Sequence, residues 1–180
     1  MQSLHAVPRL FLRGAVVAGL VATALAGPVT AASADTTPSP TTAAADAKQV
    51  FGLLNAERKA HALPALRWNT RLVSAAHGHN LRMAKANLLS HQLPGESPLG
   101  TRLTAAGYKW RAAAENCGMT SDWSLTGIEA VQRSMYNEVA PNDGHRRAIL
   151  STTYHDIGID IVMDAVHHKA WITEDFGAAL

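Results

Sequence analysis

The chain has 180 residues, 16 basic and 14 acidic side chains, and a formal net charge of +2 at pH 7. This balance excludes the strongly basic surface by which nucleic-acid-binding proteins are recognised, so we expect no nucleic-acid partner. A single cysteine, Cys117, excludes an intramolecular disulfide. The fold must therefore be stabilised by packing, with a bound metal as a further contribution. We interpret Cys117 as a buried, unreactive thiol.

Residues 1–34 have the layout of a secretory signal peptide. Arg9 and Arg13 precede an apolar run over residues 14–26, and Ala32-Ser33-Ala34 supplies a cleavage site of small residues. The apolar run is shorter than the ~20 residues that span a bilayer, so we expect cleavage and no stable membrane insertion afterwards. The predicted location is extracellular, with association with the cell wall as a further option.

Two segments follow the predicted signal peptide. Residues 35–47 are rich in Thr, Pro and Ala and contain no large apolar side chain, which predicts a flexible linker. Residues 48–180 have the length of one domain with a single core.

The first predicted helix has an apolar face made by Val50, Leu53 and Leu54, and it ends at a turn before Pro64. A second helix begins after a cap at Asn69 or Thr70. Its apolar face recurs at spacings of three and four, through Leu72, Ala76, His79, Met83 and Ala86.

The histidines of this second helix differ in position. Because His79 lies on the apolar face, we interpret it as a hydrogen-bonded core residue and not as a ligand. His77 lies off that face, which favours a solvated side chain.

Further elements follow in the second half of the domain. A short helix over residues 98–106 is closed by Gly107, and a strand is predicted over 112–119. A helix that starts at Ser124 or Thr126 must end before Pro141.

The C-terminal segment predicts a hairpin. Isoleucines alternate with other residues over 157–163, residues 164–169 turn the chain, and 170–176 return as a second strand. His167 and His168 fall in the turn, where we expect exposed side chains. Helices followed by a terminal hairpin indicate an α+β fold in which helices cover a small antiparallel sheet.

Two imidazoles and two carboxylates are candidate functional groups: His91, Glu115, Glu138 and His145. They are residue types that a divalent-metal site or an acid/base cleft uses. Each lies in a distinctive phrase: Ser90-His91, Ala114-Glu115-Asn116, Tyr136-Asn137-Glu138 and Gly144-His145-Arg146.

Two further phrases flank these four in the chain. One precedes them, Leu54-Asn55-Ala56-Glu57-Arg58, and one follows them, Trp171-Ile172-Thr173-Glu174-Asp175-Phe176-Gly177. In this order they resemble the CAP superfamily, which groups cysteine-rich secretory proteins, antigen 5 and pathogenesis-related 1 proteins, and in particular its bacterial secreted branch. The chain departs from the family's phrases at Ala114 for Gly, Met135 for Trp, Ala148 for Asn and Glu174 for Gln.

The resemblance implies an α-β-α sandwich with a cleft that holds two histidines and two glutamates. By motif these are His91, Glu115, Glu138 and His145. Neutral imidazoles bind zinc well, so we predict His91 and His145 as ligands of zinc or another divalent metal. Glu115 and Glu138 complete the predicted metal site by holding metal-bound water, accepting its proton or orienting the imidazoles. Without metal, the four could instead form a network that only holds two loops together.

Three functions remain open at this point. We favour a secreted, non-catalytic binding module for a lipid-like small molecule or a cell-envelope component, since the resemblance implies lipid or sterol binding. A metal-assisted hydrolase of peptide or cell-wall bonds is the second, with Glu115 and Glu138 as its candidate catalytic residues, although the chain lacks H-E-x-x-H and G-x-S-x-G motifs. The third is an extracellular interaction protein in which the four residues are purely structural.

Overall fold

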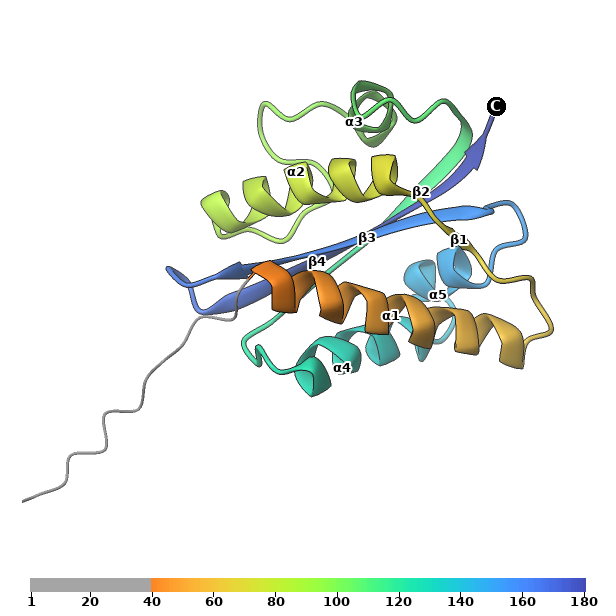
Figure 1. Cartoon of the computed structure of the whole chain (residues 1–180), viewed down its shortest axis with the longest axis horizontal. Helices are drawn as coiled ribbons and strands as arrows, with labels where there is room; N and C mark the ends of the chain where they lie inside the picture. The colour runs from red at the N-terminus through yellow and green to blue at the C-terminus, as the bar shows by residue number, and fades with distance from the viewer. Residues whose placement is uncertain (1–39) are drawn as a thin grey trace, which may run out of the picture. The chain divides into compact units, whose positions relative to one another are not determined.

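A computed structural model gives the fold, and it describes residues 40–180 (Figure 1). The predicted signal peptide and residues 35–39 of the predicted linker lie outside the described residues. Within residues 40–180, no helix is both long enough and apolar enough to cross a membrane.

A four-stranded sheet in the order β1-β3-β4-β2 forms the centre of the domain. The predicted hairpin is formed by β3 (Asp156–Asp164) and β4 (Lys169–Ala179), and β2 (Trp110–Thr120) pairs antiparallel with the other side of β4. The fourth strand, β1 (Arg67–Trp68), pairs parallel with β3. The sheet is therefore mixed, because a two-residue parallel strand, too short to be predicted, extends the expected antiparallel part.

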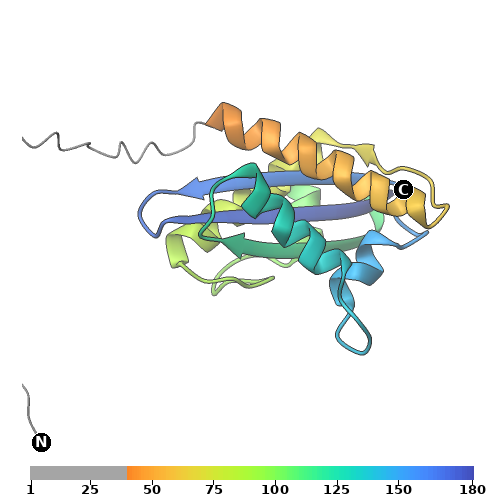
Figure 2. The same ribbon diagram turned by 90° about the horizontal axis from the view of Figure 1, so that it is seen from below.

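Helices cover both faces of the sheet (Figures 1 and 2). One face is covered by α1 (Pro40–Ala60) and α4 (Leu125–Tyr136), with the short α5 (Gly144–Ile149) beside them. The other is covered by α2 (Thr70–Ala86) and α3 (Leu99–Ala105). This three-layer arrangement confirms the predicted α+β class and the α-β-α sandwich.

The alternation in β3 divides its side chains between the two layers. Ile157, Ile159 and Ile161 are buried in the core that also contains residues of α1 and α4. Gly158 faces α2, where a Cβ atom would lie 2.2 Å from the backbone nitrogen of Val73. A glycine is therefore required here, because no side chain fits between β3 and the first turn of α2.

The prediction that residues 35–47 form a flexible linker is wrong for residues 40–47, which are helical. Ala43 and Ala47 are buried against the core, and Asp46 is buried beside them. Alanine has the highest intrinsic helix propensity, so small side chains can extend a helix that packs closely against its neighbours. The ordered domain thus begins at least eight residues before the predicted boundary at residue 48.

The predicted helix ends are confirmed where capping residues mark them. Asn69 accepts a hydrogen bond from the backbone N–H of Arg71 at 3.0 Å and begins α2. Ser124 accepts one from Gly127 at 3.2 Å and begins α4. After α3, Gly107 has a φ of +82°, the left-handed conformation expected of a glycine that follows a helix.

Candidate metal centre

The four predicted site residues come together beside the edge strand β2. Glu115 lies on β2 itself, and His91 lies in the loop between α2 and α3. Glu138 follows α4, and His145 is the second residue of α5. The ring centroids of the two histidines are 6.4 Å apart, so elements from both layers meet at one place.

The first pair is formed by His91 and Glu115. The Nδ1 atom of His91 lies 3.0 Å from Oε1 of Glu115, and the imidazole is 61% exposed whereas the carboxylate is only 3% exposed. The hydrogen bond to Glu115 raises the pKa of His91, although burial opposes this. Burial would raise the pKa of Glu115, but hydrogen bonds from His91 and Arg102 outweigh it and the pKa is lowered.

The second pair is formed by His145 and Glu138. The Nδ1 atom of His145 lies 2.5 Å from one carboxylate oxygen of Glu138, and the backbone N–H of His145 donates to the other at 2.9 Å. Burial of Glu138 is outweighed by these hydrogen bonds, which lower its pKa. The side chain of Glu138, two residues after the end of α4, thus holds the start of α5.

Both imidazoles bind a carboxylate through Nδ1, and no hydrogen bond to either Nε2 atom is found within residues 40–180. This is how metal-binding histidines are usually oriented, with a carboxylate on one ring nitrogen and the metal on the other. Two histidines that bind one zinc at about 2.0–2.1 Å have ring centroids roughly 5–6 Å apart. The observed 6.4 Å is longer than this, so the two rings must approach one another before both Nε2 atoms can reach one cation.

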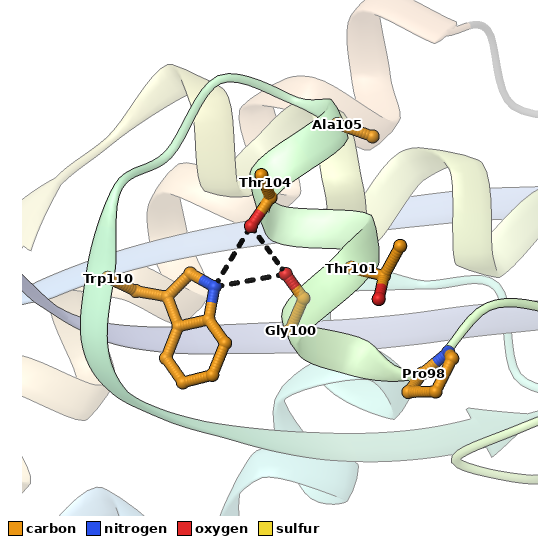
Figure 3. Close-up of a pocket in the computed structure, with 6 residues that line it drawn as sticks. All are labelled: Pro98, Gly100, Thr101, Thr104, Ala105 and Trp110. Atoms are coloured by element: carbon orange, nitrogen blue, oxygen red, sulfur yellow. Dashed lines mark hydrogen bonds between the residues drawn. The ribbon is translucent and has the colours of Figure 1, made fainter.

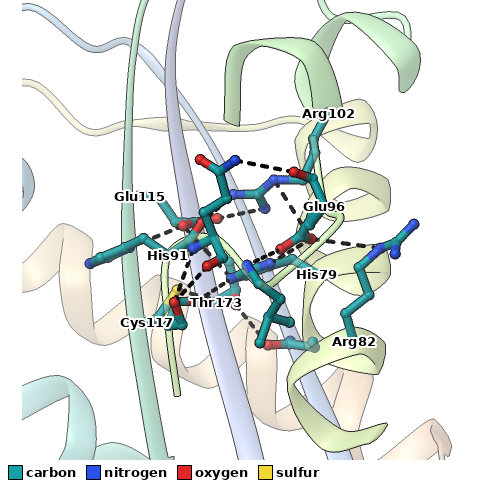
Figure 4. A network of polar contacts seen from close by, with 12 residues as sticks. His79, Arg82, His91, Glu96, Arg102, Glu115, Cys117 and Thr173 are labelled. Atoms are coloured by element: carbon teal, nitrogen blue, oxygen red, sulfur yellow. Dashed lines mark hydrogen bonds and ion pairs between the residues drawn. The ribbon is translucent and has the colours of Figure 1, made fainter. Parts of the chain in front are cut away.

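Arg102, which sequence reasoning missed, completes the first pair (Figure 4). From α3, its Nη1 lies 2.8 Å from Oε2 of Glu115, and its Nη2 donates to the backbone oxygen of His91 at 3.1 Å. Both oxygens of Glu115 are therefore engaged, one by His91 and one by Arg102. In this geometry Glu115 orients His91 and does not face a cation directly.

Asp175 is a second functional neighbour that was not predicted. It is fully buried and is the cross-strand partner of Glu115 in the β2–β4 pairing. Burial, reinforced by the charge of Glu115, raises the pKa of Asp175 well above its usual value. The buried Asp175 and Glu115 therefore disfavour each other's ionisation, and Arg102 offsets this for Glu115.

Comparison with known proteins agrees with this architecture. The family model described as the cysteine-rich secretory protein family, CAP, matches residues 51–176. The chain belongs to this family.

Relatives of this CAP domain come from several bacteria. It is 30% identical over 141 residues to the uncharacterized protein YkwD of Bacillus subtilis. The aligned region covers 78% of this chain and 52% of YkwD, so the chain spans about half of that relative. An extracellular protein of Bacillus anthracis that contains an SCP domain is 25% identical with a TM-score of 0.65, over 79% of this chain and 44% of that one. An outer surface protein of Borrelia burgdorferi shares the fold, at 17% identity and a TM-score of 0.64, over 76% and 94% of the two chains.

A second group of ligand types in the CAP domain suits a cation less well. One ligand atom each of His79, Glu115 and Cys117 lies within 4.8 Å of the others. However, His79 has both nitrogens engaged, Nδ1 by Glu96 at 2.8 Å and Nε2 by the carbonyl of Ser90 at 2.9 Å. Burial raises the pKa of the Cys117 thiol, which opposes the thiolate that a metal requires. The predictions of a satisfied core histidine and a buried thiol are thus confirmed.

The remaining predicted histidines lie away from the centre. His77 is exposed, 3.2 Å from a carboxylate oxygen of Asp160. In the β3–β4 turn, His167 binds Asp164 at 2.7 Å and His168 stacks on Trp123 with ring centroids 4.4 Å apart. Within residues 40–180, none of the three belongs to a group of three or more potential metal ligands.

A pocket of about 600 Å³ opens between α3 and the start of β2 (Figure 3). The indole N–H of Trp110 donates to the carbonyl of Gly100 at 3.0 Å and to the hydroxyl of Thr104 at 3.2 Å, which fixes the ring in one orientation. Trp110 precedes Glu115 by five strand residues, about 17 Å. The pocket is thus a separate, largely apolar surface on the same edge of the domain.

Proposed function

We propose that this CAP domain is a secreted, non-catalytic binding module whose cleft holds zinc or another divalent cation between His91 and His145. The observation that supports it most strongly is the shared orientation of the two imidazoles. Each is held by a carboxylate at Nδ1 while its Nε2 has no hydrogen bond from residues 40–180. The extracellular location is supported by the relatives described as extracellular and outer surface proteins.

Each site residue has a distinct role in this proposal. His91 and His145 bind the cation through Nε2, and Glu115 and Glu138 hold the Nδ1 protons. Arg102 partly neutralises Glu115. Two imidazole ligands leave coordination positions open, which water or an acidic group of the bound molecule would occupy.

For the bound molecule we propose a lipid-like compound or a cell-envelope component, the ligand class that the resemblance to the CAP superfamily implies. The pocket beside Trp110, about 17 Å along the strand from Glu115, would take an apolar part of a molecule long enough to reach both places.

The engagement of the glutamates favours binding over hydrolysis. Both oxygens of Glu115 are engaged by His91 and Arg102, and both oxygens of Glu138 are engaged by His145. A general base must reach the water that it deprotonates, and each of these four carboxylate oxygens already faces His91, His145 or Arg102 at 3.0 Å or less.

Calorimetric titration of zinc into the metal-free chain tests the proposal. We expect one-to-one binding that His91→Ala and His145→Ala each weaken by at least about 100-fold, because each removes a ligand. Glu115→Gln should weaken binding by about 10–100-fold, the usual effect of losing a carboxylate behind a ligating histidine.

His77→Ala is the matched control, since His77 is also an exposed histidine beside a carboxylate. Its zinc affinity should equal that of the wild type. Absence of zinc binding by the folded wild type, or equal affinity after His91→Ala, would reduce the four residues to the structural network of an interaction protein.

A further inference from the structure

A second pocket, of about 260 Å³, lies between α2 and α3. Its lining includes Ser74, Gly78, Arg82, Glu96, Arg102 and Ala105.

Arg82 and Arg102 both approach one glutamate of this pocket, Glu96, through their Nε atoms (Figure 4). The Nε atoms of Arg82 and Arg102 lie 3.7 and 3.8 Å from the same oxygen of Glu96, Oε1. These distances are too long for hydrogen bonds. Both oxygens of Glu96 already have other hydrogen-bond partners. Its Oε1 binds His79 at 2.8 Å, and its Oε2 accepts from the backbone N–H of Leu93 at 3.1 Å.

Arg102 supplies a buried donor without an acceptor. Its side chain is only 8% exposed, and its Nε atom has no hydrogen-bond partner among residues 40–180. Buried donors are almost always paired, because an unpaired one has lost its hydrogen bonds to water. Arg102, a lining residue of the pocket, therefore carries a buried charged donor whose acceptor is missing.

The donor groups and the shape of the pocket favour a small anion. Two arginines and one glutamate carry the formal charges of its lining, and Arg102 is also ion-paired with Glu115. Part of its wall is made by small side chains, and a Cβ at Gly78 would meet no atom within 4 Å apart from its chain neighbours and the backbone of α2 itself. Guanidinium groups recognise carboxylate and phosphate oxygens through paired N–H donors.

We propose that this pocket binds a small oxyanion, a carboxylate or phosphate group, between Arg82 and Arg102. The site is distinct from the proposed metal centre, although Arg102 contacts both: its Nη atoms hold Glu115 and the backbone of His91, and its Nε faces Glu96 at the pocket. The inference does not depend on metal binding and is tested without metal.

The test is a titration of the metal-free chain with sodium phosphate, and separately with sodium acetate, followed by NMR at constant ionic strength. We expect saturable shifts of the Gly78 amide and the Arg102 Nε–H signals at millimolar anion. Saturable shifts with phosphate alone would identify the bound group as a phosphate. Saturable shifts with acetate would identify it as a carboxylate. Absence of saturable shifts with both anions would overturn the proposal.

Two variants and two matched controls locate the binding. Arg82→Ala, at an exposed position, should weaken anion binding about tenfold or more, and Gly78→Phe should abolish it by filling the pocket. Lys85→Ala, one turn along α2, and Gly52→Phe, at an equally open helical glycine, should leave the affinity unchanged. Binding that survives Gly78→Phe, or that Lys85→Ala weakens as much as Arg82→Ala, would contradict a site in this pocket.

Discussion

Replacement of Glu174 by glutamine is expected to stabilise the domain at neutral and alkaline pH. Glu174 is completely buried on β4, and one of its oxygens accepts a hydrogen bond from Asn116 at 3.0 Å. Its other oxygen has no hydrogen-bond partner among residues 40–180. Burial raises the pKa of Glu174 to about 8, and the charge of Glu57 contributes in the same direction.

The raised pKa makes stability depend on pH in a defined direction. Between the unfolded pKa of 4.5 and about 8, the folded chain keeps a proton that the unfolded chain has lost. Stability is therefore full below pH 4.5 and decreases as the pH rises towards 8, by about 1.4 kcal/mol per pH unit at most. Glutamine, which the family's phrase has at this position, keeps the shape and does not titrate.

Urea denaturation at pH 5 and at pH 8 measures this effect. The wild type should lose about 3 kcal/mol more unfolding free energy between these two pH values than Glu174→Gln does. Glu129→Gln, at a solvent-accessible glutamate on α4, should behave like the wild type. An equal pH dependence for Glu174→Gln and the wild type would show that Glu174 is ionised in the folded state.

The second large effect is expected at Arg58, the last residue of the Leu54-Asn55-Ala56-Glu57-Arg58 phrase. Arg58 is 1% exposed and donates three hydrogen bonds to backbone oxygens, to Pro64 at 2.9 Å, Ile149 at 2.7 Å and Ser151 at 2.8 Å. The carbonyl of Ile149 is one of those that the end of α5 leaves without a helical partner. Arg58 therefore joins α1 to the helix that carries His145.

Arg58→Met should lower the unfolding free energy by about 3 kcal/mol or more, because methionine keeps the bulk but leaves buried carbonyls unpaired. Urea denaturation gives this value directly. Lys59→Met, at the neighbouring exposed position of the same helix, should change it by less than about 0.5 kcal/mol. A loss below about 1 kcal/mol for Arg58→Met would mean that water replaces the guanidinium at these carbonyls.

Elements with strong periodicity and a clear cap could be predicted from the sequence. In α2, the buried face contains Leu72, Ala76, His79 and Met83 as predicted, and Asn69 caps the helix. The β3–β4 hairpin was evident because isoleucines alternate up to a polar turn. These are local signals, which hydrophobic spacing and capping chemistry determine.

The missed elements carry no strong local signal. The first turns of α1 contain no large apolar side chain, and their burial depends on how closely alanine packs against the rest of the fold. The short α5 has only six residues, too few for helical periodicity to be recognised.

The site was predicted only as far as its motifs extend. The histidine and glutamate positions come from short phrases, whereas Arg102 and Asp175 act through contacts made by tertiary packing. Arg102 lies beside the buried Leu103 on a seven-residue helix, and nothing in its own segment marks it as a partner of Glu115. The sequence did indicate that Glu115 needs a partner, because a buried carboxylate requires a cationic or hydrogen-bonding group beside it.

The most direct test of the metal centre is an anomalous-scattering measurement at the zinc absorption edge on crystals of the zinc-loaded chain. We predict one strong peak within about 2.0–2.2 Å of the Nε2 atoms of both His91 and His145, with Glu115 and Glu138 still bound to the Nδ1 atoms. A peak on His79 and Cys117, a peak in the β3–β4 turn, or no peak between the two imidazoles would contradict the proposed centre.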